Sequence, residues 1–159
     1  MAEVRGSLTI IVRCSDPRLN RFFLDDEFRR RMGLPELAST EQRNGPGGGS
    51  APLEATIANV GGLLPFSGRG PGGGERLAED AGLLISLFAD GEARILLTAH
   101  SSCGGYAASG ESVSSELAEK WQRQDLREAA GALRRRLPEA RIEGFFLRLE
   151  TGEVEPVAV

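Results

Sequence analysis

Short apolar runs alternate with longer amphipathic stretches along the chain. Continuous aliphatic and β-branched runs bounded by turn residues are typical of buried strands. The pattern predicts five strands, at residues 8–12, 55–60, 93–99, 141–150 and 154–159. The last two flank a tight turn at Thr151 and Gly152, which predicts that the chain folds back on itself there.

Amphipathic stretches between the strands predict helices. The first is expected to begin at Asn20 as a cap and to end at Gly33 and Pro35. Its apolar side chains can share much of one face, namely Phe22, Phe23, Leu24, Phe28 and Met32. A second helix is expected from Glu75 to about Phe88, with Asp90 and Gly91 as its stop. Each helix would pack its apolar face against the sheet.

The last helical stretch spans about 112–137, with a break expected near Gln124 or Gly131 and an end at Pro138. Strands that alternate with helices predict an α/β fold, in which a mostly parallel β-sheet is flanked by helices. We expect one domain over residues 1–159, because the length suits a single core. Glycine-rich loops are expected inside it, at about 39–50 and 67–74.

Composition and charge exclude some classes of function. Hydrophobic residues make up 40% of the 159 residues and charged residues 26%, as in globular proteins. No apolar run is long enough to span a membrane, and residues 1–6 lack the apolar core of a signal peptide, so we expect a cytoplasmic protein without a membrane partner. The net charge of −4 and the lack of a large basic cluster argue against nucleic acid as a partner.

The scarce residues carry the candidate chemistry. Both cysteines and the single histidine fall in two short motifs, Cys14-x-Asp16-x-Arg18 and His100-x-x-Cys103, and each motif directly follows a predicted strand. Ligands gather at the carboxyl ends of strands in open α/β sheets. If the two strands are neighbours, two thiols and one imidazole converge, which predicts a zinc site with an open fourth position. Asp16 could fill or guard that position, held ionised by Arg18.

Other interpretations of these residues remain open at this point. Cysteine and histidine also occur as ordinary buried side chains, and Asp16 could close a purely structural zinc site. Cys103 could instead act as a nucleophile with His100 as its base, although Cys14 would then have no role. A phosphatase-type loop is excluded, because it needs an arginine at the position of Ser109. The metal site is preferred because it uses all three residues.

The paired motifs resemble the zinc signature of the beta-class carbonic anhydrases. The segments Ile57-Ala58-Asn59, Ile95-Leu96-Leu97 and Ile142-Glu143-Gly144-Phe145-Phe146 resemble that family as well, so the likeness runs over nearly the whole chain. The resemblance implies the family's fold and one Zn²⁺ per chain, bound by Cys14, His100 and Cys103. It also implies reversible hydration of carbon dioxide to bicarbonate by a zinc-bound hydroxide, which makes the protein a lyase.

The resemblance assigns further roles. Asp16 and Arg18 would form the catalytic dyad, in which the carboxylate accepts a hydrogen bond from zinc-bound water. In some members the same aspartate becomes a fourth metal ligand in a closed state, so Asp16 is an alternative ligand. Gly104 and Gly105 would let the backbone approach the floor of the substrate pocket. A homodimer or higher homo-oligomer is implied as the assembly.

Two points limit the resemblance. The stretch before the first predicted strand is too short for the family's N-terminal helical arm, so the likeness is to a small member without it. No second histidine can carry protons, which leaves Tyr106, Glu54 or buffer as the shuttle. The same site would also suit a carbonyl sulfide or carbon disulfide hydrolase, or a zinc-binding relative without catalytic activity.

Overall fold

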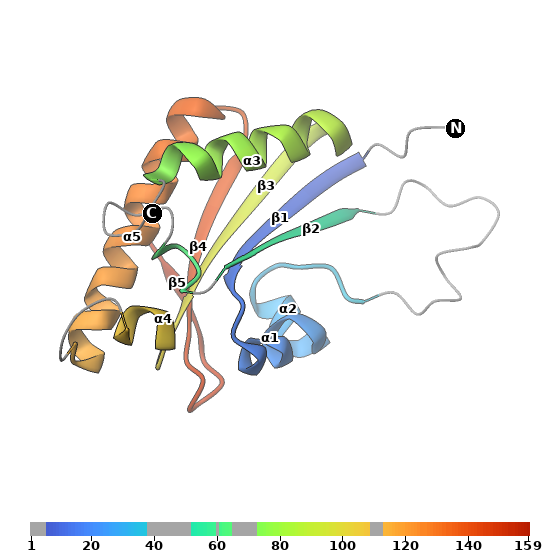
Figure 1. Cartoon of the computed structure of the whole chain (residues 1–159). Coiled ribbons are helices and arrows are strands. Elements are labelled where there is room, and N and C mark those ends of the chain that lie inside the picture. Colours follow the sequence, from blue (N-terminus) through green and yellow to red (C-terminus); the bar gives the residue numbers. More distant parts are fainter. Residues whose placement is uncertain (1–5, 38–51, 60, 65–72, 109–112) are drawn as a thin grey trace.

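The structure is a computed structural model and describes residues 6–37, 52–59, 61–64, 73–108 and 113–159. Five strands form one sheet, namely β1 (Gly6–Cys14), β2 (Leu53–Asn59), β3 (Ala89–His100), β4 (Arg141–Leu147) and β5 (Val154–Val157). The helices are α1 (Asn20–Leu24), α2 (Asp26–Arg31), α3 (Gly73–Phe88), α4 (Gly104–Ala107) and α5 (Ser115–Arg136). The predicted α/β class is therefore confirmed, and all five predicted strands are present (Figure 1).

The sheet has the strand order β2-β1-β3-β4-β5. Strand β1 pairs in parallel with both β2 and β3, β4 pairs in parallel with β3, and β5 pairs antiparallel with β4. The chain thus leaves β1 toward one edge of the sheet and returns to build β3 on the other side of β1. This reversal makes the carboxyl ends of β1 and β3 a topological switch point, where open α/β sheets bind their ligands.

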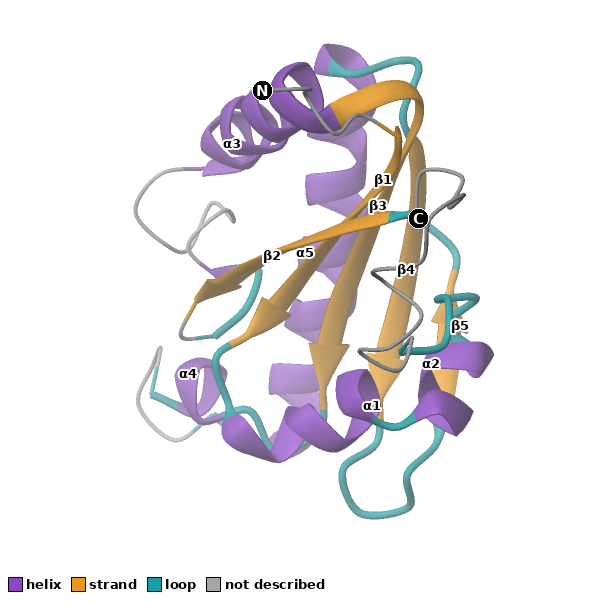
Figure 2. Ribbon diagram, turned by 90° about the vertical axis from the view of Figure 1, so that its right-hand side faces the viewer, coloured by secondary structure: helices purple, strands orange, loops and turns teal. Residues whose placement is uncertain are grey.

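Helices cover the sheet on both faces (Figure 2). On one face α3 and α5 pack on the strands, and the core there includes Ile10, Val12, Leu77, Leu126 and Leu133. On the other face α1 and α2 lie near the carboxyl ends of the strands, and a second core forms there around Ile11, Phe22, Met32, Leu96 and Phe145. Since alternate residues of β1 face opposite cores, its continuous apolar run follows from burial on both sides.

The first helix was predicted as one continuous helix, but the structure has two, α1 and α2. Asp25 is extended, with φ −103° and ψ 125°, and its side chain accepts a hydrogen bond from the backbone N–H of Glu27. Asp25 therefore caps α2 and separates it from α1. The start was also misplaced. Asn20 is the first residue of α1, and the cap position before it belongs to a 3₁₀ turn, Pro17–Leu19, that begins after Asp16.

Other boundaries also differ from the sequence prediction. Helix α3 ends at Phe88 as expected, but β3 begins at Ala89, earlier than the predicted residue 93, so that Asp90 and Gly91 lie within the strand, where Gly91 takes up φ 111°. The long helix α5 has no break at Gln124 or Gly131. Helix α4 was missed, since four residues with two glycines carry no helical periodicity.

Much of the glycine-rich loop prediction lies outside the described residues, which exclude 38–51 and 65–72. Gly73 and Gly74 fall instead in the first turn of α3. The single-domain prediction stays a prediction. Within the part of the chain that the structure describes, no helix is both long and apolar enough to cross a membrane.

A buried arginine joins α2 to the edge strand β2. Arg29 is only 2% exposed and donates to both carboxylate oxygens of Glu54, at 2.6 and 3.2 Å. Its guanidinium also donates to the backbone carbonyls of Phe23, at 2.9 Å, and Pro35, at 2.8 Å. Because the charge is both paired and hydrogen-bonded, its burial is tolerated, and it fixes α1 and α2 against the sheet.

Replacing Arg29 by alanine should therefore destabilise the fold. We expect Arg29→Ala to lower the free energy of unfolding by about 2 to 3 kcal/mol, because Glu54 and two carbonyls lose their donor. Arg30→Ala is the matched control, since the Arg30–Glu36 pair lies on the surface, with both side chains about two-thirds exposed. Urea denaturation of the two variants measures the difference. Equal losses would show that Arg29 does not hold these elements together.

Candidate metal centre

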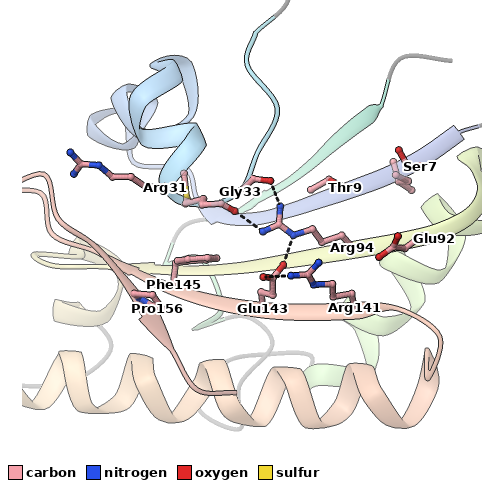
Figure 3. Close-up of a pocket in the computed structure, with 12 residues that line it drawn as sticks. Ser7, Thr9, Arg31, Gly33, Glu92, Arg94, Arg141, Glu143, Phe145 and Pro156 are labelled. Atoms are coloured by element: carbon pink, nitrogen blue, oxygen red, sulfur yellow. Dashed lines mark hydrogen bonds and ion pairs between the residues drawn. The ribbon is translucent and has the colours of Figure 1, made fainter. Parts of the chain in front are cut away.

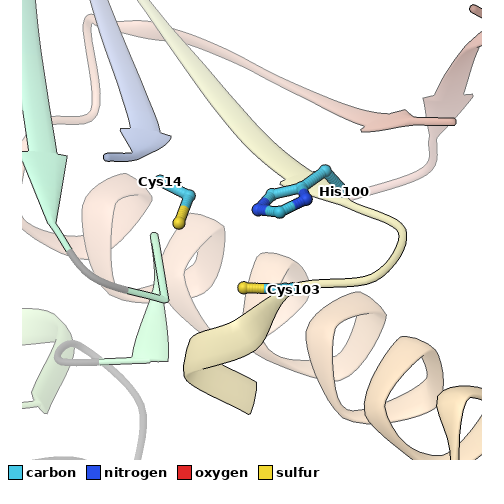
Figure 4. A group of neighbouring side chains, drawn as sticks. All are labelled: Cys14, His100 and Cys103. Atoms are coloured by element: carbon cyan, nitrogen blue, oxygen red, sulfur yellow. The ribbon is translucent and has the colours of Figure 1, made fainter. Parts of the chain in front are cut away.

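The two cysteines and the histidine converge at the switch point. Cys14 is the last residue of β1, His100 is the last residue of β3, and Cys103 immediately precedes α4. Their ligand atoms all lie within 4.8 Å of one another, and all three residues are buried. Figure 4 shows the two sulfur atoms and the imidazole ring facing a common point. The convergence predicted from the two motifs is thus present in the structure.

The imidazole of His100 is oriented for a metal. Its Nδ1 lies 2.8 Å from the backbone carbonyl oxygen of Ser101, and a carbonyl can only accept, so Nδ1 carries the proton. Its Nε2 is then the atom with a free lone pair. Nε2 is buried and has no hydrogen-bond partner in the part of the chain that the structure describes, which is rare for a buried polar atom. A metal ion bound at Nε2 would account for it.

Gln122 on α5 fixes the backbone of the same histidine. Its Oε1 accepts from the His100 backbone N–H at 3.1 Å, and its Nε2 donates to the His100 carbonyl at 3.0 Å. Gln122 is only 2% exposed, so these bonds form without competition from water. The side-chain amide therefore holds the end of β3 in place as a further strand would.

The two thiols titrate as a pair. A hydrogen bond from Cys103 lowers the pKa of Cys14 to about 4, with further contributions from His100 and the backbone N–H of Asp16, against the opposing effect of burial. The Cys14 thiolate and burial both raise the pKa of Cys103, although backbone N–H groups of Tyr106 and Gly105 oppose them. A second thiolate is thus disfavoured by the first, and a divalent cation between the sulfurs would remove that penalty.

The donor set fits zinc. Two thiolates and one imidazole are soft or borderline ligands, and zinc sites with three protein ligands leave a fourth position for water or substrate. The orphaned Nε2 of His100 and the paired thiols are the observations that support this fit. Asp16 is not part of the group of ligand atoms within 4.8 Å of one another.

Asp16 is instead held by Arg18. Its Oδ1 accepts from the Arg18 backbone N–H at 2.9 Å and from Nε at 3.0 Å, and its Oδ2 accepts from Nη2 at 2.6 Å. These bonds hold the pKa of Asp16 below its usual range, so the carboxylate stays ionised. Nη2 of Arg18 also donates to the Ser102 carbonyl at 3.0 Å, which connects the pair to the loop between His100 and Cys103.

Glycines allow close packing around Cys14. In the turn after β2, Gly62 has φ 59°, and a Cβ there would lie 3.2 Å from the backbone nitrogen of Cys14. Gly104 and Gly105 begin α4 directly after Cys103. A Cβ on Gly104 would meet nothing within 4 Å, so the chain's own packing does not require glycine at that position. Their role at a pocket floor stays a prediction.

The pockets differ in their relation to the centre. A pocket of about 650 Å³ lies at the opposite end of the sheet beside the first residues of β1, and Arg94, Arg141 and Glu143 are among its lining residues (Figure 3). There Arg94 donates to Glu143 and to the carbonyl of Gly33, and Arg141 donates to Glu143. A hollow of about 560 Å³ borders Cys103 itself. We therefore expect small molecules to reach the three ligand atoms through this hollow beside Cys103.

The two shuttle residues considered from the sequence lie elsewhere or are engaged. Glu54 is paired with Arg29 and lies beside Thr9 in the sheet, several residues from the carboxyl ends of the strands. Tyr106 is 1% exposed, and its hydroxyl donates to Asp125 at 2.5 Å. Neither side chain is presented to solvent near the sulfur atoms. Of the three carriers expected from the sequence, these contacts disfavour Glu54 and Tyr106, and a role for buffer stays a prediction.

Two residues that support the centre were not predicted. Gln122 reaches His100 from a distant helix, and Glu150 binds Ser101 and Ser102 from the turn between β4 and β5. Gln122 lies in the helix that the sequence predicted, whereas Glu150 was expected at the end of the strand 141–150 and lies in the turn that follows Leu147. A polar residue such as Gln122 on the buried face of a helix indicates that it has a hydrogen-bond partner, but the sequence does not show which residue that partner is.

Comparison with known proteins relates the whole arrangement to one group of structures. No protein-family model and no curated protein matches the sequence. Among solved structures, the tetrameric beta-carbonic anhydrases of Sordaria macrospora match with a TM-score of 0.58 at 12% identity, over 98% of this chain and 82% of theirs. The beta-carbonic anhydrase of Aspergillus fumigatus matches with a TM-score of 0.51 at 15% identity, over 94% of this chain and 74% of that one.

A bacterial structure agrees with the fungal ones. The carbonic anhydrase of Streptococcus mutans matches with a TM-score of 0.50 at 17% identity, over 99% of this chain and 86% of that one. At these identities the likeness concerns the fold. The structure described here, from its parallel sheet to the antiparallel β5, has a beta-class carbonic anhydrase-like fold.

Proposed function

We propose that the protein is a zinc-dependent enzyme that catalyses the reversible hydration of carbon dioxide to bicarbonate. The observation that carries this proposal is the buried group of Cys14, His100 and Cys103, in which the Nε2 atom of His100 has no hydrogen-bond partner among the described residues. Similarity to solved carbonic anhydrases supports the choice of reaction. The three residues would hold one Zn²⁺ per chain.

Zinc supplies the nucleophile in this chemistry, because it lowers the pKa of water that it binds to about 7. The protein supplies the orientation. Asp16 is ionised and lies at the rim of the centre, with 13% of its side chain exposed, so it can accept a hydrogen bond from a water proton. Arg18 fixes the direction of that carboxylate through its own three contacts.

The position of Asp16 favours the dyad role over the closed state. Both carboxylate oxygens accept from Arg18, so the side chain would have to give up these bonds to reach a metal as its ligand. Asp16 and Arg18 would therefore act in catalysis, and the fourth metal position would remain for water or substrate.

We propose a homo-oligomer as the assembly and a single domain as its unit. The structurally similar enzymes of Sordaria macrospora are tetrameric, which supports an oligomer of more than one chain. The small-molecule substrate needs no further macromolecular partner.

Zinc-loaded protein should hydrate carbon dioxide in a metal-dependent way. Cys103→Ser is the matched blank, because it replaces one ligand atom with an oxygen that zinc prefers less and should lose the metal. Stopped-flow measurement with a pH indicator, between about pH 6.5 and 9, compares the two proteins after metal analysis. We expect a rate above the blank that rises with pH.

Two results would contradict the proposal. If zinc is bound but carbon dioxide is hydrated no faster than with the Cys103→Ser protein at any pH, the protein is not a hydratase. If zinc is retained equally by Cys103→Ser, the metal is bound elsewhere. Circular dichroism of both proteins shows that the substitution has left the fold intact.

The dyad can be separated from metal binding. Asp16→Asn keeps the size of the side chain but removes its charge and one acceptor oxygen. We expect the variant to keep its zinc and to lose about 100-fold in kcat, because proton transfer and orientation by a placed side chain contribute rate in this range. Zinc content and kcat are measured on the same sample. An unchanged kcat would exclude a catalytic role for Asp16.

A further inference from the structure

The two residues between the metal-ligand candidates His100 and Cys103 are fastened to another part of the chain. The hydroxyl of Ser101 donates to Oε2 of Glu150 at 2.6 Å, and the hydroxyl of Ser102 donates to Oε1 at 2.7 Å. Glu150 lies in the turn between β4 and β5, far from the serines in sequence. One carboxylate thus binds both residues of the intervening loop.

The loop needs such support because its backbone is strained. Ser102 has φ 56°, and among the described residues it is the one non-glycine residue with a positive φ. That left-handed conformation is unfavourable for an L side chain and persists where surrounding contacts impose it. The bend at Ser102 turns the chain between the end of β3 and Cys103. The direction of the Cys103 side chain relative to His100 therefore depends on this bend.

Two further hydrogen bonds hold Ser101 but do not reach Ser102. The Ser101 N–H donates to the Leu147 carbonyl at 3.0 Å, and the Leu149 N–H donates to the Ser101 hydroxyl at 2.8 Å. Ser102 is held by its hydroxyl bond to Glu150 and by the Arg18 bond to its carbonyl at 3.0 Å. Glu150 therefore supports the side of the loop that leads to Cys103.

The charge of Glu150 suits this task. The serine hydroxyls lower its pKa to about 2, so the carboxylate is ionised and accepts both bonds at any pH near neutrality. Arg148 and Arg18 are the cations that face it. Glu150 borders the hollow beside Cys103 and a second hollow beside Arg18, so it lies between the ligand loop and the dyad.

We propose that Glu150 is a positioning residue of the metal centre, which fixes the relative placement of His100 and Cys103 by accepting hydrogen bonds from Ser101 and Ser102. The inference rests on the proposed function, since it takes these residues as zinc ligands. Glu150 does not touch the metal. It acts through the loop, as outer contacts of metal sites do when they orient ligands.

The test compares Glu150→Ala with Glu153→Ala. Glu153 lies in the same turn and carries the same charge, but its side chain makes no hydrogen bond or ion pair with the rest of the described chain. We expect Glu150→Ala to release zinc to a colorimetric chelator about tenfold faster than the parent protein, within the range found for outer contacts of metal ligands. Glu153→Ala should release zinc at the parent rate.

Two further readings separate positioning from general stability. The visible spectrum of the Co²⁺-loaded protein reports ligand geometry, and we expect it to change in Glu150→Ala but not in Glu153→Ala. Glu150→Gln keeps one acceptor oxygen, so its zinc release should be slower than that of Glu150→Ala but faster than that of the parent protein. Equal release rates and equal Co²⁺ spectra for the two alanine variants would overturn the inference.

The route through the serines is tested by combining variants. If Glu150 acts through the two hydroxyls, adding Glu150→Ala to the Ser101→Ala and Ser102→Ala double variant should not accelerate zinc release further. A full additional acceleration would overturn that route. None of these measurements uses carbon dioxide. A parent protein that binds neither zinc nor Co²⁺ would instead defeat the proposed function, and the inference with it.

Discussion

The parallel pairing of β1 with β3 is the constraint on which the metal centre depends. Val12 pairs with Leu97, so both strands end at the same edge of the sheet with Cys14 and His100 as their last residues. Parallel neighbours at a reversal of strand order leave a crevice that no helix fills. A thiol and an imidazole meet there although 85 residues separate them in the sequence, and Cys103 completes the group from the loop that follows.

A layer of hydrogen bonds then orients two of the three ligand candidates, His100 and Cys103. The Ser101 carbonyl fixes the imidazole, Gln122 fixes the backbone of His100, and Glu150 fixes the loop that leads to Cys103. Arg18 connects this layer to Asp16 through the Ser102 carbonyl. Metal ligands that are held in this way lose little freedom when the ion binds, which favours affinity and a defined geometry.

The sequence predicted those parts of the fold that local patterns determine. Continuous apolar runs located the strands, and the placement of Cys14 and His100 just after two of them led to the metal centre. The division between α1 and α2 was missed because Asp25 can cap a helix as readily as continue one. Gln122 and Glu150 were missed for another reason. Their bonds join distant segments, and one sequence contains no signal for such a pairing.

X-ray absorption at the zinc edge of the metal-loaded protein tests the central claim most directly. With Cys14, His100 and Cys103 as ligands, the spectrum should show two sulfur atoms at about 2.3 Å, together with nitrogen or oxygen atoms at about 2.0 Å. The imidazole should be recognisable by its outer scattering. A shell of oxygen and nitrogen alone, or a shell of four sulfur atoms, would place the metal outside this group and contradict the account.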